Sequence, residues 1–376
     1  MSVPRKKWED SSVTGPIRIL CVAGARPNFM KLAPLFRAFS CDPALVPVLV
    51  HSGQHYDYSM SGQFFSDLGL PLPSYNLEVG SGSHAQQTAE IMKRFEDVVL
   101  KERPSAVLVV GDVNSTMACA LVAKKLGASV IHVEAGLRSF DRSMPEEINR
   151  LVTDAISDLL LVTEESGVHN LEKEGVAPEK IHFVGNLMID SLFFHLERAR
   201  NSPILDELGL RGKSFGLVTL HRPSNVDDHA QLQEILGGLQ IISQDLPLYF
   251  PVHPRTRARL DGQELAPGLR LLEPLGYLDF VCLMSHSAVV LTDSGGIQEE
   301  TTALSIPCLT LRNNTERPVT IDEGTNTLAG TNRASILAAW QELKSTPKLG
   351  RVPELWDGNA AKRSIVAIRA LFSSTR

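Results

Sequence analysis

Residues 106–116 read Ala-Val-Leu-Val-Val-Gly-Asp-Val-Asn-Ser-Thr. Five consecutive apolar residues without polar alternation favour a short strand buried on both faces, as in a parallel sheet covered by helices. Gly111 and Asp112 follow this strand directly. Ligands of open α/β sheets bind outside the carboxyl ends of the strands, so the residues after such a run are candidates for chemistry.

The same pattern recurs along the chain, and stretches with helical periodicity separate the repeats. Ser83 and Gln86 form a capping-box pattern ahead of apolar residues at helical spacing. Alternating strands and helices predict the α/β class. We expect about eleven strands, several ending at a glycine or proline: Ile17–Ala23, Val46–Val50, Ala106–Val110, Ser129–Val133, Leu159–Val162, Ile181–Val184, Phe215–Leu220, Leu248–Val252, Leu269–Leu272, Ala288–Leu291 and Cys308–Leu311.

Eleven strands are too many for one comfortable doubly wound sheet, and 376 residues suggest more than one domain at about 150 residues each. A single closed βα barrel is the alternative, but the strands are unevenly spaced for it. We therefore expect two Rossmann-like doubly wound domains facing a cleft. The expected order is a disordered tail (1–16), an N-terminal domain (17–190), a C-terminal domain (191–360) and a C-terminal helix (361–376) packing back on the N-terminal domain.

Composition excludes several classes of protein. The net charge is −6, and no block of like charge is longer than Arg5–Lys7, which argues against a nucleic-acid partner. No apolar run has the roughly 18–20 residues of a membrane span, and the polar start lacks the apolar core of a secretion signal. The five cysteines have no C-x-x-C spacing. We expect reduced cysteines in a cytoplasmic protein that does not insert into a membrane.

The stretch Asp293-Ser294-Gly295-Gly296 follows an apolar strand and begins a helix-like segment. Glycines admit close backbone approach, and helix N-terminal N–H groups favour an anion, so this stretch is a candidate phosphate site. Glu300, one turn further on, is placed to bind ribose hydroxyls, and Arg26 and Arg317 to clamp a diphosphate. The plain alternative is a tight turn with Ser294 as helix cap.

Two standard nucleotide motifs are missing from the sequence. There is no G-x-G-x-x-G after the first strand and no G-x-x-x-x-G-K-[ST], which argues against NAD, FAD and P-loop chemistry. The sequence suggests a nucleoside diphosphate bound without an obligatory metal.

Acids and bases follow several of the expected strands. Asp112 and Glu134 come directly after buried strands, where we favour catalytic roles over surface or capping roles. The adjacent Glu146 and Glu147 follow Pro145 at an expected helix start, and the sequence does not rank them. His221 lies at a strand end. His132-x-Glu134 has the form of a zinc deaminase motif, but no P-C-x-x-C follows, so no metal site is expected.

Short motifs spread over nearly the whole chain point to one family. In order, they are Arg26-Pro27 with Lys31, Gly53-Gln54-His55, Gly111-Asp112, His132-Val133-Glu134-Ala135-Gly136-Leu137-Arg138, Pro145-Glu146-Glu147-Ile148-Asn149-Arg150, Gly185-Asn186, His221-Arg222, Pro251-Val252-His253-Pro254, Thr292-Asp293-Ser294-Gly295-Gly296-Ile297-Gln298-Glu299-Glu300 and Thr315-Glu316-Arg317-Pro318. Together these motifs resemble the bacterial non-hydrolysing UDP-N-acetylglucosamine 2-epimerases.

The resemblance implies the two-domain GT-B type of fold, with the C-terminal domain binding UDP. It also implies a homodimer without a cofactor, serving polysaccharide synthesis. The implied reaction interconverts UDP-GlcNAc and UDP-ManNAc by elimination of UDP to a 2-acetamidoglucal and its re-addition. Implied catalytic residues are Asp112, Glu134, Glu146 and His221; implied substrate contacts are Arg26, Lys31, Phe280, Ser294, Gly295, Gly296, Glu300 and Arg317; residues matching a second, activating UDP-GlcNAc site are Gln54, His55, Arg222 and His253.

The chain departs from the family pattern at Ala25, Asn28 and Val113, and Asp57 stands where a glutamine is common near the second site. Residues 53–58 and 139–142 also resemble relatives that act on modified sugars, including UDP-2,3-diacetamido-2,3-dideoxyglucuronate. Four alternatives therefore stay open: an epimerase of a modified UDP-HexNAc, a hydrolysing 2-epimerase, a GT-B glycosyltransferase and a non-catalytic nucleotide-sugar binder.

Overall fold

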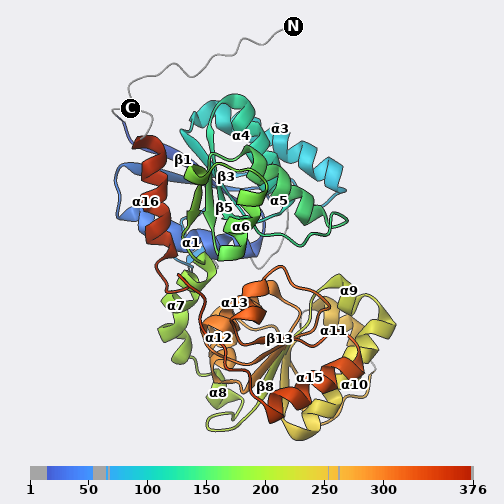
Figure 1. Cartoon of the computed structure of the whole chain (residues 1–376). Helices are drawn as coiled ribbons and strands as arrows, with labels where there is room; N and C mark the ends of the chain where they lie inside the picture. Colours follow the sequence, from blue (N-terminus) through green and yellow to red (C-terminus); the bar gives the residue numbers. More distant parts are fainter. Residues whose placement is uncertain (1–14, 54–64, 67, 253, 261–262, 374–376) are drawn as a thin grey trace. The chain divides into compact units, whose positions relative to one another are not determined.

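The computed structural model describes residues 15–53, 65–66, 68–252, 254–260 and 263–373. The chain divides into two compact units, each described here by itself (Figure 1). The N-terminal unit comprises Met1–Ser191 and Asp357–Arg376, and the C-terminal unit comprises Leu192–Trp356.

The described strands of the N-terminal unit form one parallel seven-stranded sheet in the order β3-β2-β1-β4-β5-β6-β7. The central strand β4 is buried along its whole length, which explains its uninterrupted apolar sequence. The strands are β1 (Ile17–Ala23), β2 (Leu45–His51), β3 (Tyr75–Asn76), β4 (Ala106–Val110), β5 (Ser129–Ala135), β6 (Leu159–Val162) and β7 (Ile181–Phe183).

The C-terminal unit repeats this plan with six described parallel strands in the order β10-β9-β8-β11-β12-β13. Its strands are β8 (Gly216–Thr219), β9 (Leu248–Pro251), β10 (Leu269–Leu272), β11 (Val289–Thr292), β12 (Cys308–Thr310) and β13 (Asn326–Leu328). The prediction of two parallel α/β sheets is confirmed.

All eleven expected strands are present, but the expected number was too low. The two missing strands, β3 and β13, are edge strands of two and three residues. Segments this short have no detectable alternation, and each has only one neighbouring strand to define it.

Helices cover both sheets. Residues Ser83 and Gln86 make the predicted capping box at the start of α3, and Ile91 and Phe95 of that helix are fully buried on the sheet. The N-terminal unit carries α1 (Arg26–Ser40), α3 (His84–Glu102), α4 (Asn114–Leu126), α5 (Pro145–Ile156), α6 (Glu165–Lys173), a 3₁₀ turn (Pro178–Lys180) and the start of α7 (Leu187–Arg200).

The C-terminal helix α16 (Ala360–Ser373) lies against α1 in the N-terminal unit (Figure 1). Asp190 accepts bonds from the first N–H groups of α16, those of Ala360 at 3.0 Å and Ala361 at 2.8 Å. Arg369 pairs with Asp42 at the other end. A carboxylate of α7 at the N-terminus of α16 and a salt bridge near its C-terminus thus fix this helix to the N-terminal unit.

The remaining helices belong to the C-terminal unit, where α10 and α15 contribute most of the helical side of its core. They are α8 (Ile204–Glu207), α9 (Pro223–Val226), α10 (His229–Asp245), α11 (Pro254–Leu260), α12 (Tyr277–His286), α13 (Gly295–Ala303), α14 (Pro318–Asp322) and α15 (Arg333–Ser345).

Each strand order reverses once, between β1 and β4 in the first sheet and between β8 and β11 in the second. At such a switch point the connections leave in opposite directions, and a crevice opens at the carboxyl ends of the two strands. The loops after β1, β4, β8 and β11 are therefore the first places to look for a site.

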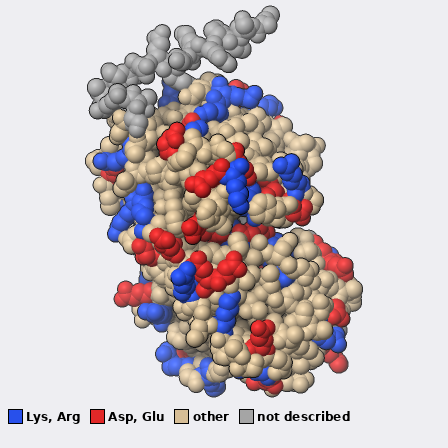
Figure 2. Space-filling model, in the orientation of Figure 1, with Lys and Arg blue, Asp and Glu red and all other residues tan. Residues whose placement is uncertain are grey.

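The distribution of charged residues on the surface agrees with the modest net charge of the chain. On the visible face of each unit, Lys and Arg are interspersed with Asp and Glu (Figure 2). Cys21, Cys119, Cys282 and Cys308 are buried free thiols, while Cys41 is exposed. Among the described residues, no helix has the length and apolar character needed to cross a membrane.

Gly136 offers a test of the packing between β5 and α6. Its φ is +82°, and a Cβ there would lie 2.4 Å from the Gly167 carbonyl oxygen. We expect Gly136→Ala to lower the free energy of unfolding of the N-terminal unit by about 3 kcal/mol, from backbone strain and overpacking. Gly175→Ala is the control, because Gly175 also has positive φ but no described atom within 4 Å of a Cβ. Urea unfolding that shows equal losses for both variants would contradict this packing.

Candidate functional site

The switch point of the N-terminal sheet is closed by the side chain of Asn28. Its Oδ1 accepts the backbone N–H groups of Gly24 at 3.1 Å and Ala25 at 2.9 Å, and its Nδ2 donates to the Val110 carbonyl at 3.1 Å. One amide thus ties the loop after β1 to the end of β4. Arg26, the first residue of α1, is exposed next to this bridge.

Glu134 lies in a bulge of β5. The register against β6 shifts between Val133 and Ala135, and Glu134 has φ +71°, which non-glycine residues rarely adopt. Its carboxylate is almost fully buried and pairs with Lys31 of α1. A strained backbone that aims a buried acid at a cation is typical of functional sites.

Asp112 begins the connection from β4 to α4, beside Glu134. A Cβ on Gly111 would lie 3.8 Å from Glu134 Oε2, so the residue before Asp112 lies against the Glu134 carboxylate. Arg150 of α5 pairs with the Asp112 carboxylate, and Asn149 donates to its backbone carbonyl at 2.8 Å. The Asp112 side chain keeps 36% of its surface exposed. The structure thus brings together the predicted residues Lys31, Asp112 and Glu134.

The structure gives different surroundings to the two adjacent glutamates of α5, Glu146 and Glu147. Glu147 is buried, and its carboxylate accepts the backbone N–H groups of Ser139 at 2.9 Å and Phe140 at 3.0 Å, as well as two bonds from Arg150. Burial acts to raise the pKa of Glu147, but these donors outweigh it and hold the pKa below its ordinary value. Glu147 anchors the loop before α5, whereas Glu146 is half-buried in the first turn.

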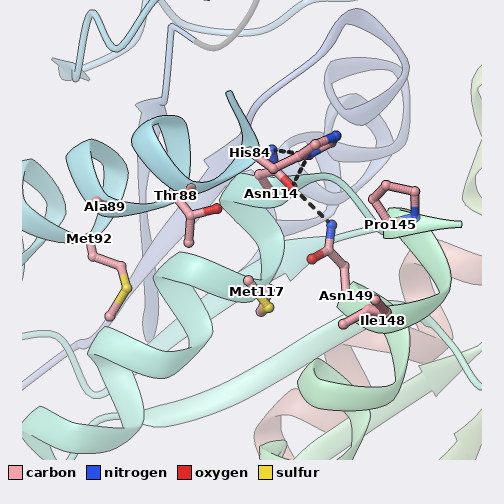
Figure 3. Close-up of a pocket in the computed structure, with 10 residues that line it drawn as sticks. His84, Thr88, Ala89, Met92, Asn114, Met117, Pro145, Ile148 and Asn149 are labelled. Atoms are coloured by element: carbon pink, nitrogen blue, oxygen red, sulfur yellow. Dashed lines mark hydrogen bonds between the residues drawn. The ribbon is translucent and has the colours of Figure 1, made fainter. Parts of the chain in front are cut away.

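A groove of about 390 Å³ lies between α3, α4 and α5 (Figure 3). His84, Asn114 and Asn149 point toward one another at its polar end, and Thr88, Met92, Met117 and Ile148 line the rest. Asn114 also donates to Gln87 at 2.7 Å. Since Asn149 holds the Asp112 carbonyl, this polar end supports the Asp112 loop from behind.

The switch point of the C-terminal sheet is bridged by Asp293, which is fully buried after β11. Its carboxylate accepts the backbone N–H groups of His221 and Arg222 after β8, at 3.1 and 3.0 Å, and Asn225 Nδ2 at 3.1 Å. His221 Nδ1 lies 2.9 Å from Asp293 Oδ1. Burial acts to raise the Asp293 pKa, but the contacts with His221 and Arg222 lower it overall. Asp293 thereby fixes an exposed His221 ring at the strand end.

Ser294, Gly295 and Gly296 form the start of α13. Ser294 occupies the N-cap position, but its side chain makes no capping bond with the described residues. No described atom lies within 4 Å of a Cβ built on Gly295. The N-terminal turn of α13 therefore presents N–H groups beside open space, which is the geometry of a phosphate site.

Three further residues that were predicted to contact the substrate belong to the C-terminal unit. Arg317 Nε donates to Glu299 Oε1 at 2.6 Å, which orients its guanidinium at the start of α14. Glu300 in α13 is buried and accepts the Tyr277 hydroxyl at 3.1 Å. Phe280 is half-buried in α12, and its N–H is bonded to the Gly276 carbonyl at 3.0 Å.

Of the residues predicted for a second sugar-nucleotide site, Gln54, His55 and His253 lie outside the described residues. Arg222 is described: its Nε donates to the Asp293 carbonyl at 3.1 Å, and its NH2 lies 3.5 Å from Glu316. Glu316 also makes a two-bond pair with Arg312.

Sequence reasoning quoted Asn149 and Arg150 within a family motif and Asn28 as a departure from the family pattern, but it assigned no role to these three supporting residues. Arg150 follows Glu147 by three residues, and this helical spacing was the sequence signal for the ion pair between Arg150 and Glu147. The partners of Asn28 and Asn149 lie far away in the sequence, so no local pattern indicates them.

Comparisons with known proteins decide the family. The family model described as UDP-N-acetylglucosamine 2-epimerase matches residues 37–369. The chain belongs to this family. It is an epimerase, and its fold is of the GT-B type, as the resemblance implied.

Similarity to individual relatives supports the same family. The UDP-N-acetylglucosamine 2-epimerase of Methanocaldococcus jannaschii is 42% identical over 86% of this chain and 91% of its own. The UDP-2,3-diacetamido-2,3-dideoxy-D-glucuronate 2-epimerase of Pseudomonas aeruginosa is also 42% identical, over 85% of this chain and 90% of its own. The crystal structure of the M. jannaschii UDP-GlcNAc 2-epimerase with UDP-GlcNAc and UDP matches with a TM-score of 0.86 and 39% identity, covering 94% of this chain and all of that one.

The different surroundings of Glu146 and Glu147 predict different effects of the same substitution. Glu147→Gln removes the charge that pairs with Arg150 and replaces one acceptor oxygen with a donor. We expect it to lower the free energy of unfolding by about 2 kcal/mol or more. Glu146→Gln, the matched control, should change unfolding by less than about 0.5 kcal/mol. A urea titration that ranks the two variants in the opposite order would refute the anchoring role of Glu147.

Glu300 predicts a pH dependence of stability in the C-terminal unit. Burial, with a further contribution from Glu299, raises the pKa of Glu300 from 4.5 to about 7, against a smaller lowering by the Tyr277 hydroxyl. Between these two pH values the folded state holds the proton that the unfolded state has lost, so stability falls as pH rises through this window and levels off above it.

Glu300→Gln should remove that part of the pH dependence. The measurement is the urea midpoint of the C-terminal unit for both proteins at several pH values from 4.5 to 8. An equally steep decline in the variant would show that Glu300 is not its source.

Proposed function

We propose that the enzyme inverts C2 of a UDP-N-acetylhexosamine, with UDP-GlcNAc and UDP-ManNAc as the leading pair. The observation that carries the proposal is the Glu134 bulge, which holds an acid beside Lys31 and the Asp112 loop in a chain of this family. The phosphate-type geometry at the start of α13 is the second support.

The proposed reaction has two halves. A carboxylate removes the C2 proton, the C1–C2 double bond forms, and the C1–O bond breaks with its electron pair leaving on UDP. In the reverse half, the β-phosphate oxygen re-adds to C1 while an acid delivers a proton to the opposite face of C2. The C2 proton is weakly acidic, so the step needs a positioned base and a stabilised leaving group.

We assign the acid and base work to Asp112, Glu134 and Glu146. Two of these carboxylates are paired with cations, Asp112 with Arg150 and Glu134 with Lys31, which orients them. Different elements present the three acids: the connection after β4, the bulge of β5 and the first turn of α5. One group can therefore remove the proton from one face of C2 while another delivers a proton to the opposite face. Such an arrangement suits an inversion at C2.

We assign UDP to the C-terminal unit. The α13 N-terminus, with Ser294, Gly295 and Gly296, would hold a phosphate, and Glu300 would accept the ribose hydroxyls. Arg317, Arg26 and Lys31 would contribute positive charge to the diphosphate, and Phe280 would meet the uracil. His221, whose ring contacts Asp293, would stabilise the leaving phosphate.

A second candidate substrate has a specific observation in its favour. The diacetamido-glucuronate epimerase of P. aeruginosa is as similar to this chain as the M. jannaschii UDP-GlcNAc epimerase is, at 42% identity. UDP-2,3-diacetamido-2,3-dideoxyglucuronate differs from UDP-GlcNAc at C3 and C6 of the sugar, but the two compounds have the same acetamido group at C2. The same acids would therefore act on it without a change of mechanism.

The remaining implications of the family are part of the proposal. They are a homodimer, a cytoplasmic role in polysaccharide synthesis, and activation by a second UDP-GlcNAc near Arg222. Hydrolysis of the intermediate to free sugar and UDP is the competing outcome. A closed site disfavours it, because water is then excluded from the glycal.

Incubation in D2O without an acceptor tests the proposal. The enzyme is given UDP-GlcNAc or UDP-2,3-diacetamido-2,3-dideoxyglucuronate, and proton NMR follows C2. We expect the C2 epimer to appear with deuterium at C2 for at least one substrate. Free N-acetylmannosamine as the main product would indicate the hydrolysing alternative, and absence of exchange with either substrate would reject the proposal.

Substitution of the assigned acids separates chemistry from binding. Asp112→Asn and Glu134→Gln should each lower kcat by about 100-fold or more, because each removes an acid–base group. UDP affinity, measured by calorimetry, should change little, since neither carboxylate is assigned to hold UDP. Glu96→Gln, a surface change on α3, is the control and should leave kcat unchanged. A near-normal kcat in either acid variant would remove that residue from the assignment.

A further inference from the structure

His132 lies in β5, two residues before Glu134, with no exposed surface. Its ring joins two elements. Nδ1 lies 2.6 Å from Asp154 Oδ1 in α5, and Nε2 lies 2.8 Å from the carbonyl oxygen of Gly111 after β4. A side chain without exposed surface does not contact substrate, so any role in the reaction acts through the residues that it holds.

Both partners of the ring are acceptors. A backbone carbonyl has no proton to donate, and an ionised carboxylate has none either. With Asp154 ionised, both ring nitrogens must donate, which makes His132 an imidazolium. The other arrangement would place the proton on Asp154 and leave a neutral ring.

The surroundings of Asp154 favour its ionised form. Its Oδ2 lies 2.7 Å from Arg138 NH1 and accepts the Gly136 N–H at 3.1 Å. Burial acts to raise the pKa of Asp154, but His132 and Arg138 outweigh it and lower the pKa below its ordinary value. Arg138 also makes a two-bond pair with Glu174. The buried Arg138 thus lies between the buried Asp154 and the partly exposed Glu174, whose side chain keeps 36% of its surface exposed.

We propose that His132 is a positioning residue that donates from both ring nitrogens and thereby holds Gly111, and with it Asp112, against the Glu134 bulge. The Gly111 N–H donates to the Val133 carbonyl at 3.0 Å, so residues of β5 hold the two peptide units on either side of Gly111, one by its N–H and one by its carbonyl. The link to catalysis rests on the proposed roles of Asp112 and Glu134, whereas the protonation of the ring does not.

The ring protonation is tested directly on the wild-type protein. Nitrogen NMR of histidine-labelled enzyme, assigned with His132→Asn, should show a proton on both ring nitrogens of His132, as the two acceptors require. Asp154→Asn should convert the ring to the neutral form with the proton on Nε2, because an asparagine amide can donate to Nδ1. A neutral ring in the wild-type protein at pH 7 would overturn the proposal.

Two substitutions test the positioning role. A glutamine amide reaches about as far as Nε2 and can still donate to Gly111, whereas an asparagine amide reaches only toward Asp154. We expect His132→Asn to lower kcat about 100-fold with KM within about threefold, because misplacement of catalytic groups by about 1 Å has effects of this size. His132→Gln should lose only about 10-fold, a partial rescue by the restored donor to Gly111.

Equal losses in the two variants, or a kcat near normal in His132→Asn, would overturn the positioning role. A cooperative urea transition of the N-terminal unit serves as the folding control and should be retained in both. If the wild-type enzyme epimerises neither UDP-sugar, the proposed function fails and the link to catalysis falls with it, while the NMR signal still decides the protonation of the ring.

Discussion

The candidate site residues depend on hydrogen bonds that join the two strand ends at the switch point of each sheet. Where connections leave two neighbouring strands in opposite directions, backbone groups at the strand ends need other partners, and buried polar groups are costly without them. Asn28 supplies the bridge between β1 and β4, and Asp293 supplies it between β8 and β11. Both bridges are single side chains that satisfy several backbone groups at once. They fix the loops from which Arg26, Asp112, His221 and Ser294 are presented.

Two buried ion pairs, Asp154 with Arg138 and Glu147 with Arg150, give further support to the N-terminal part of the site. Asp154 and Glu147 are both in α5, and each joins a cation to backbone N–H groups. Their donors come from the loops that contain Gly136 and Ser139. This support explains how Glu134 keeps a φ that costs about 1–2 kcal/mol for a non-glycine residue. The strain is local, and the surrounding ion pairs and hydrogen bonds stabilise the strained conformation.

The sequence was a good guide wherever a property depends on local pattern. Continuous apolar runs identified the buried strands, and the positions of Asp112 and Glu134 after two of them marked both acids as candidates. It failed where a property depends on partners distant in the chain: the edge strands β3 and β13 are too short for a pattern, and the left-handed backbone of Glu134 has no glycine to indicate it. Glu146 and Glu147 were indistinguishable because only the folded loop at Ser139 and Phe140 supplies the N–H groups that bind Glu147.

The central claim is that carboxylates of the N-terminal unit remove and return the C2 proton while UDP leaves and returns. Positional isotope exchange measures the second half of this claim directly. UDP-GlcNAc, or the diacetamido-glucuronate analogue if that is the substrate, is prepared with ¹⁸O in the bridge between C1 and the β-phosphorus. Breaking of the C1–O bond frees the β-phosphate oxygens to exchange places, so the account predicts that ¹⁸O moves into non-bridging positions as the epimer forms. Epimer that forms with all of its ¹⁸O still in the bridge would contradict it.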